Sequence, residues 1–185
     1  MNRLQTQISK FLSYTLRHHP ERFNIEVDAQ GYVDLEDIVN IVDKRFPNHQ
    51  IDKKCIEEVT KDSEKRRFEI VNDRIRAFYG HSVRNKIEMD IAESVPDKLY
   101  HGTNPKAYQQ IKKEGLKRKS RQYVHLSKSI DTAYSVGKRR TDNPIILIIH
   151  SNQAIKDGIK FYKSGDMYLA DYIPPSYVTL YMHNY

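Results

Sequence analysis

Apolar residues recur at helical spacing along three stretches of the first half of the chain. Over residues 4–18 they lie three or four positions apart, and His19-Pro20 predicts the end of this helix because a residue before proline avoids helical backbone. A second helix is expected to begin after Asp34, whose carboxylate suits an N-cap. A third is expected over residues 52–62.

A period-two pattern follows these helices. Residues 67–70 and 74–78 alternate around the turn-forming pair Asn72-Asp73, which predicts a β-hairpin. The alternation places Arg74 and Arg76 on the same face of the second strand. Three helices followed by a hairpin are typical of a winged helix.

The second half mixes shorter helices and strands without a repeated βαβ unit, so the fold class is α+β. A charged linker over residues 88–98 predicts two domains, residues 1–92 and 93–185. The expected elements are strand 99–101, helix 105–114, strand 123–127, helix 129–138 and strand 145–149, followed by short strands.

Composition narrows the class of protein. With 38% hydrophobic and 30% charged residues among 185, the chain can bury a core. No apolar run approaches the ~18–20 residues of a membrane span. A cytoplasmic protein, or a nuclear one in a eukaryote, is expected, with a monomer as the default. The single cysteine, Cys55, has no intramolecular disulfide partner and is expected to be buried.

The positive charge is concentrated in the second half. Residues 96–185 carry 15 Lys and Arg against 7 Asp and Glu, whereas residues 1–95 carry 16 against 17. Residues 112–121 alone hold six cations and one anion. Such a segment suits a polyanion such as RNA or a dinucleotide, although a solvated basic loop explains it as well.

Known nucleotide and metal motifs are missing from the sequence. It contains neither GxGxxG nor GxxxxGK[ST], so any dinucleotide needs another architecture. His18, His19 and the distant Cys55 do not have zinc-ligand spacing, and we expect no metal. Arginine and histidine instead gather at the ends of elements, where each alone is more often a surface or structural residue.

Taken together and in order, several motifs resemble the tRNA 2′-phosphotransferase (KptA) family, and they span nearly the whole chain. They are Ser9-Lys10-Phe11-Leu12-Ser13-Tyr14-Thr15-Leu16-Arg17-His18, Gly31-Tyr32-Val33-Asp34, Arg74-Ile75-Arg76-Ala77, Gly80-His81-Ser82, Leu99-Tyr100-His101-Gly102-Thr103, Gly115-Leu116, Val124-His125-Leu126-Ser127, Val136-Gly137-Lys138-Arg139 and Asp171-Tyr172-Ile173-Pro174-Pro175-Ser176-Tyr177.

The resemblance implies an N-terminal winged-helix lobe that binds RNA and a C-terminal lobe with an ADP-ribosyltransferase-like split β-sheet that binds NAD⁺. It implies a catalytic tetrad of Arg17, His18, Arg76 and Arg139. It implies NAD⁺ contacts from His101, Gly102, Thr103, His125 and Ser127. Further candidates for RNA phosphate contact are Arg74, His81, Ser82, Arg121 and Arg140.

The implied reaction removes an internal 2′-phosphate, as at a tRNA splice junction. A phosphate oxygen attacks C1″ of the nicotinamide ribose and nicotinamide leaves; the 2″-hydroxyl then attacks phosphorus, giving 2′-hydroxyl RNA and ADP-ribose 1″,2″-cyclic phosphate. Three guanidinium groups suit a phosphate dianion. His18 is expected either to contact phosphate or to transfer a proton, with a helix-terminal stabilising role as the alternative.

Some positions depart from the family pattern. Tyr79 stands where glutamine is usual, Lys119 where methionine is common, and Tyr123 where a histidine often occurs. Arg140 replaces the usual histidine after Arg139, which leaves open which of the two arginines is catalytic.

Two other functions remain open at this point. One is an ADP-ribosyltransferase acting on nucleic-acid ends or protein, although a protein-modifying enzyme often has glutamate where this chain has Met167. The other is a non-catalytic winged-helix module that binds RNA.

Overall fold

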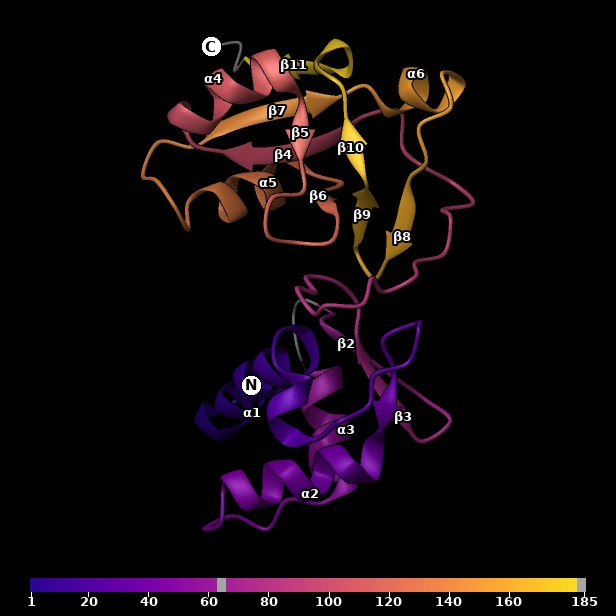
Figure 1. Ribbon diagram of the computed structural model, residues 1–185. Helices are drawn as coiled ribbons and strands as arrows, with labels where there is room; N and C mark the ends of the chain where they lie inside the picture. Colours follow the sequence, from indigo (N-terminus) through magenta and orange to yellow (C-terminus); the bar gives the residue numbers. More distant parts are fainter. Residues whose placement is uncertain (63–65, 183–185) are drawn as a thin grey trace. The chain divides into compact units, whose positions relative to one another are not determined.

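The computed structural model describes residues 1–62 and 66–182 (Figure 1). Internal contacts divide the chain into two compact units, Met1–Glu88 and Met89–Tyr185. The carbonyl of Asp90 accepts a hydrogen bond from the backbone N–H of Lys163, and Ile91 forms a β-bridge with Tyr162. Both residues therefore already belong to the second unit. The division thus falls slightly earlier than the expected one after residue 92, and the binding role of each half stays a prediction.

The helices of the first unit begin at side-chain caps. Asn2 caps α1, Asp34 caps α2 and Asp52 caps α3, each accepting hydrogen bonds from backbone N–H groups of the first turn. The helices predicted from apolar spacing are confirmed. Their bounds are α1 (Arg3–Arg17), α2 (Leu35–Arg45) and α3 (Lys53–Lys61), and a short 3-10 helix that was not predicted, η1 (Pro20–Phe23), follows α1.

An antiparallel sheet packs against these helices, with strand order β1-β3-β2. The strands are β1 (Val33–Asp34), β2 (Phe68–Val71) and β3 (Arg74–Ala77). Asn72 and Asp73 both have positive φ, as a two-residue hairpin turn requires, so the predicted hairpin is confirmed. The core joins Ile8 and Leu12 of α1 to Ile38, Ile56 and Ile75 of the other elements. The winged-helix assignment itself stays a prediction.

The second unit contains two three-stranded antiparallel sheets, ordered β11-β7-β4 and β6-β9-β8, and a short β10-β5 pair. A bridge between Tyr100 and Ser127 joins the first two at β4 and β6. The strands are β4 (Leu99–Thr103), β5 (Leu116–Lys117), β6 (Val124–Leu126), β7 (Ile145–Ile149), β8 (Tyr162–Ser164), β9 (Met167–Ala170), β10 (Tyr172–Ile173) and β11 (Val178–Leu180).

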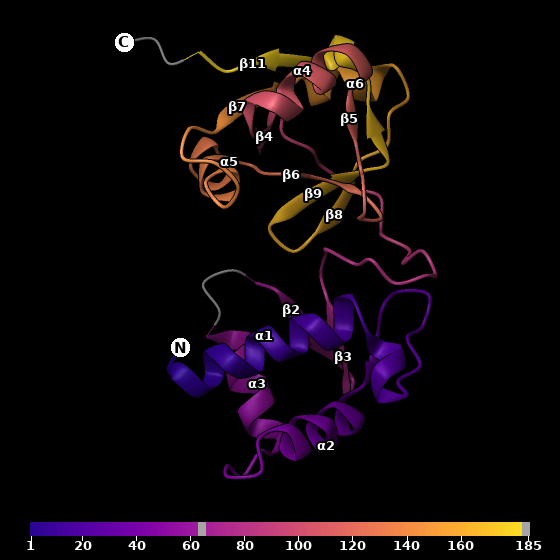
Figure 2. The same cartoon turned by 60° about the vertical axis from the view of Figure 1, so that its left-hand side comes forward.

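Helices cover these sheets, and α5 packs directly on β4 (Figure 2). The helices are α4 (Pro105–Glu114), α5 (Ile130–Gly137), α6 (Ser151–Lys156) and the 3-10 helix η2 (Pro175–Tyr177). Both units mix helices with antiparallel sheet, which is consistent with the α+β class. Whether the second unit has the ADP-ribosyltransferase fold stays a prediction.

Two expectations about single features can be compared with the structure. Cys55 is only half-buried, because it packs at the edge of the first core rather than inside it, so the expectation that it is buried is wrong. Burial still raises the pKa of its thiol, which keeps it protonated at neutral pH. Across residues 1–62 and 66–182, no helix is both long and apolar enough to cross a membrane.

Candidate active-site residues of the two units

Arg17 ends α1 and is held by aromatic rings. Its guanidinium carbon lies 5.1 Å from the centroid of the Tyr79 ring and 5.7 Å from that of Phe68. Its Nη2 donates to the carbonyl oxygen of Arg67 at 3.5 Å. Gly80, with φ +91°, packs beside the Arg17 side chain. A guanidinium held between rings is oriented without losing its charge.

His18 caps the C-terminus of α1 and is exposed. Its Nδ1 lies 2.8 Å from the hydroxyl oxygen of Ser82, and the backbone N–H of Ser82 donates to the carbonyl of Arg17 at 2.8 Å. Ser82, predicted as a phosphate contact, therefore orients the imidazole of His18. His18 follows the last helical turn rather than lying within it.

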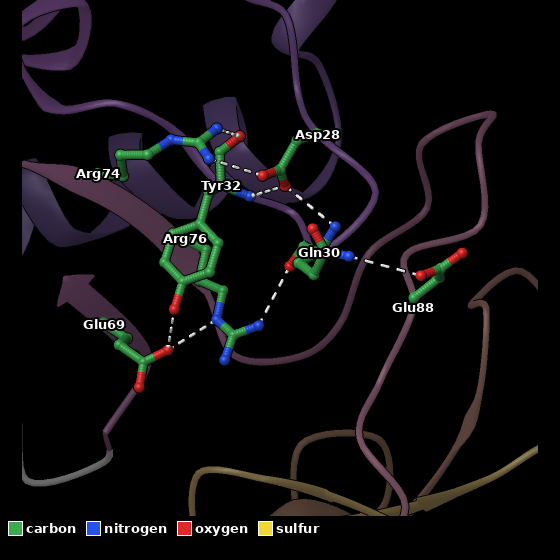
Figure 3. Close-up of polar contacts among 7 residues, drawn as sticks. All are labelled: Asp28, Gln30, Tyr32, Glu69, Arg74, Arg76 and Glu88. Atoms are coloured by element: carbon green, nitrogen blue, oxygen red, sulfur yellow. Dashed lines mark hydrogen bonds and ion pairs between the residues drawn. The ribbon is translucent and has the colours of Figure 1, made fainter. Parts of the chain in front are cut away.

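Arg76 of β3 is fixed from two sides (Figure 3). Its Nε donates to Oε2 of Glu69 at 2.7 Å, and its Nη1 donates to the carbonyl of Gln30 at 3.3 Å. The Tyr32 hydroxyl donates to the same Glu69 oxygen at 2.7 Å, and the Tyr32 ring lies 4.5 Å from the Arg76 guanidinium carbon. Burial, and then the bond to Glu69, raise the pKa of Tyr32 to about 12.

Arg74 lies on the same strand face but forms a separate contact (Figure 3). Its Nη1 donates to Oδ2 of Asp28 at 2.8 Å, and its Nη2 donates to the carbonyl of Tyr32 at 3.3 Å. Asp28 also accepts from the backbone of Tyr32 and of Gln30, which shapes the turn. Arg74 therefore supports the loop that holds Arg76, and its predicted RNA contact stays a prediction.

His81 is buried among these cations, with only 2% of its surface exposed. Burial, followed by the charges of Arg17, His18 and Arg76, lowers its pKa to about 4. Its imidazole is therefore neutral at pH 7. Its Nε2 has no hydrogen-bond partner among the described residues. A neutral ring in this position adds no positive charge to those of Arg17 and Arg76.

In the second unit the predicted NAD⁺ contacts lie on adjoining strands. The imidazole Nδ1 of His101 on β4 lies 3.0 Å from the carbonyl of His125 on β6. Burial lowers the pKa of His101, opposed by this hydrogen bond and reinforced by Arg121 and Lys119. Ser127 is buried directly after β6, where its backbone pairs with that of Tyr100.

Gly102 has a packing role at this point. A Cβ added there would lie 1.9 Å from the carbonyl oxygen of Ala133 on α5. A Cβ added to Gly137 of the same helix would lie 3.5 Å from the backbone of Gly102. Close contact between β4 and α5 requires glycine at position 102, whereas a Cβ at Gly137 would instead meet the Pro144 side chain at 2.6 Å. The predicted NAD⁺ contact of Gly102 stays a prediction. Thr103 follows, buried at the end of β4.

Arg139 and Arg140 lie in the turn that ends α5. Their backbone N–H groups donate to the carbonyls of Val136 and Gly137. Both side chains are exposed, and neither has a hydrogen bond or ion pair within residues 1–62 and 66–182. Arg121 is also exposed, in the basic loop near His101. Geometry does not separate Arg139 from Arg140.

Sequence reasoning missed the residues that hold Arg76. The register of the hairpin pairs Glu69 directly with Arg76, so the partner could have been deduced from the turn at Asn72-Asp73. Tyr32 and Gln30 could not, because they come from a loop before β1 whose path depends on tertiary packing. Tyr79, noted only as a departure from the family pattern, is the ring that contacts Arg17.

Comparisons with known proteins agree with the motifs. The model of the RNA 2′-phosphotransferase, Tpt1 / KptA family matches residues 3–170. A probable RNA 2′-phosphotransferase of Flavobacterium johnsoniae is 41% identical over 175 residues, which are 92% of this chain and 93% of that protein. One of Acetivibrio thermocellus is 38% identical over 174 residues, 94% of this chain and 95% of that protein.

A third relative comes from an archaeon. The probable RNA 2′-phosphotransferase 2 of Archaeoglobus fulgidus is 37% identical over 172 residues, which are 93% of this chain and 78% of that protein. These matches define the class of the protein as a transferase. The chain belongs to the RNA 2′-phosphotransferase, Tpt1 / KptA family, and the resemblance drawn from the motifs is confirmed.

Proposed function

We propose that this chain is an NAD⁺-dependent enzyme that removes an internal 2′-phosphate from RNA, such as a spliced tRNA. The products would be 2′-hydroxyl RNA, nicotinamide and ADP-ribose 1″,2″-cyclic phosphate. The observation that supports this most is that Arg17, His18 and Arg76 each contact a neighbour of the buried His81 or of its contact Gly31, namely Gly80, Ser82 and the carbonyl of Gln30. Such a group suits one compact dianion.

Arg17 and Arg76 are suited to binding the 2′-phosphate. Each is oriented before substrate arrives, Arg17 by rings and Arg76 by Glu69 and the carbonyl of Gln30. The Nη2 atom of Arg76 makes no hydrogen bond within the described residues, so it can donate to a phosphate oxygen. Groups oriented in advance stabilise charge that develops on phosphoryl oxygens without reorganising.

His18 is proposed to act through Nε2, since Ser82 fixes Nδ1. Nε2 would contact a phosphate oxygen or carry a proton to the departing RNA 2′-oxygen. Which nitrogen carries the proton depends on whether Ser82 donates or accepts.

NAD⁺ is proposed to bind in the second unit. When bound it supplies a ribose carbon from which nicotinamide can leave. Residues 101–103 and 125–127 fit this role: a bridge between β4 and β6 brings an imidazole and buried hydroxyls together, with Arg121 nearby. Arg139 is proposed as the fourth member of the tetrad and Arg140 as a further phosphate contact.

The test is nicotinamide release from NAD⁺ in the presence of an oligonucleotide with an internal 2′-phosphate. Release is expected only with the 2′-phosphate and only when Arg17 is intact. Release with a 2′-hydroxyl oligonucleotide would indicate a different ADP-ribosyltransferase. RNA binding without any release would indicate a non-catalytic module.

A further inference from the structure

A groove runs along one face of α1 and ends at His18. Its helical residues lie three or four positions apart and so form a single stripe. Arg67, at the start of the hairpin, forms the opposite wall and donates from Nη1 to the Ser9 hydroxyl at 3.4 Å. The lining side chains that matter here are Thr6, Ser9, Lys10, Ser13, Tyr14 and Arg67.

The chemistry of this lining suits a phosphodiester strand. It provides the half-buried hydroxyl of Ser13, the exposed ammonium of Lys10 and the guanidinium of Arg67, and no described residue lining it is acidic. Lys10 has no ion-pair partner among the described residues. Hydroxyl and cationic donors are the groups that contact nucleic-acid phosphates.

Tyr14 adds an aromatic surface to the groove. Arg22 donates to its hydroxyl at 2.6 Å, and the ring of His19 lies 4.7 Å away, so the ring is held in place. Aromatic rings beside cations are the usual means by which proteins bind single-stranded RNA, because unpaired bases stack on them.

We propose that this groove binds the single-stranded RNA that flanks the 2′-phosphate and guides it to Arg17 and His18. From Thr6 to His18 the helix rises about 18 Å, enough for several nucleotides. The groove is continuous with the proposed catalytic group, because Arg17 donates to the carbonyl of Arg67, the residue of its far wall. The inference rests on the proposed function and assigns the RNA path to α1 rather than to the basic loop at 112–121.

The test compares two substrates that carry the same 2′-phosphate, a dinucleotide and a single-stranded oligonucleotide of about ten nucleotides. The wild-type protein should have the higher kcat/KM on the longer one. Lys10→Glu should reduce kcat/KM on the longer substrate about tenfold and lower the ratio of long to short. The control, Lys44→Glu, makes the same charge change on exposed α2 and should leave both values unchanged.

Salt dependence gives a second measurement. Lys10→Gln should reduce the slope of log binding constant against log salt by about 0.7, as expected for one lost phosphate contact to a single strand. Fluorescence anisotropy can measure the binding of a ten-nucleotide RNA that lacks a 2′-phosphate. This measurement tests the groove even without catalysis. Thermal melting checks that each variant is folded.

Two failures can be told apart. If Lys10→Glu and Lys44→Glu behave alike in substrate ratio and in anisotropy, the groove is not the RNA path. If the wild-type protein releases no nicotinamide from any substrate but Lys10→Glu still weakens RNA binding, the proposed function fails and the groove stands.

Discussion

The imidazole Nδ1 of His18 lies 2.8 Å from the hydroxyl oxygen of Ser82, a residue 64 positions further along the chain. The backbone of Ser82 also binds the carbonyl of Arg17. One serine thus fixes both the end of α1 and the ring that the proposed reaction uses.

We expect Ser82→Ala to reduce kcat with little loss of stability. Without the hydroxyl, the His18 ring can rotate away from the phosphate, and misplacement by about 1 Å costs up to roughly a hundredfold in rate. A reduction of ten- to hundredfold is expected, together with a changed pH profile of kcat. The control is Ser135→Ala, an exposed serine on α5. A wild-type rate and profile for Ser82→Ala would contradict the positioning role.

Arg76→Lys and Arg74→Lys should differ strongly. Lysine keeps the charge but cannot donate to Glu69, to the Gln30 carbonyl and to a phosphate from one planar group. We expect Arg76→Lys to lose about a hundredfold or more in kcat/KM. Arg74 pairs with Asp28, and lysine can keep this ion pair, so Arg74→Lys should lose no more than about threefold in kcat/KM. Equal losses, measured at saturating NAD⁺, would show that Arg76 has no special role.

His81 should make folding stability depend on pH. Its pKa is lowered from 6.5 to about 4 by burial and by nearby cations, so between these values the unfolded state binds more protons. Stability is therefore complete above pH 6.5 and falls as pH decreases toward 4, by about 3 kcal/mol in total. Denaturant unfolding from pH 7 to pH 4 measures this loss.

The control for that dependence is substitution by a group that does not titrate. His81→Gln should flatten the loss attributed to this site, whereas His49→Gln, at an exposed position, should leave it unchanged. An unchanged slope in His81→Gln would mean that another group causes the acid sensitivity.

Gly102→Ala should damage the fold of the second unit before it affects chemistry. The added methyl group would meet the Ala133 carbonyl at 1.9 Å, so β4 and α5 must separate. A destabilisation of about 3 kcal/mol is expected, at the upper end of the usual cost of overpacking, because the clash is with backbone. The melting temperature, measured by circular dichroism, should fall together with the activity. A stable variant that has lost only NAD⁺ affinity would show instead that Gly102 serves the ligand alone.

Local patterns predicted the elements well where each element carries its own signal. The spacing of Ile8, Leu12 and Leu16 defines α1, and Asn72-Asp73 defines the hairpin. Two-residue strands such as β1 and β5 have no periodicity of their own and exist only through their partners, so they could not be predicted.

The candidate site was predictable to a similar extent. The motif identified Arg17, His18 and Arg76 as candidates, but their roles remain predictions. The burial of His81 and the ring of Tyr32 beside Arg76 depend on contacts between distant segments, which one sequence does not specify.

The path of the phosphorus atom can be followed with an oligonucleotide whose internal 2′-phosphate carries ³²P. With NAD⁺ present, the label should leave the RNA and appear in ADP-ribose 1″,2″-cyclic phosphate, matched mole for mole by nicotinamide. Label released as inorganic phosphate, or retained on RNA while nicotinamide accumulates, would contradict the proposed function.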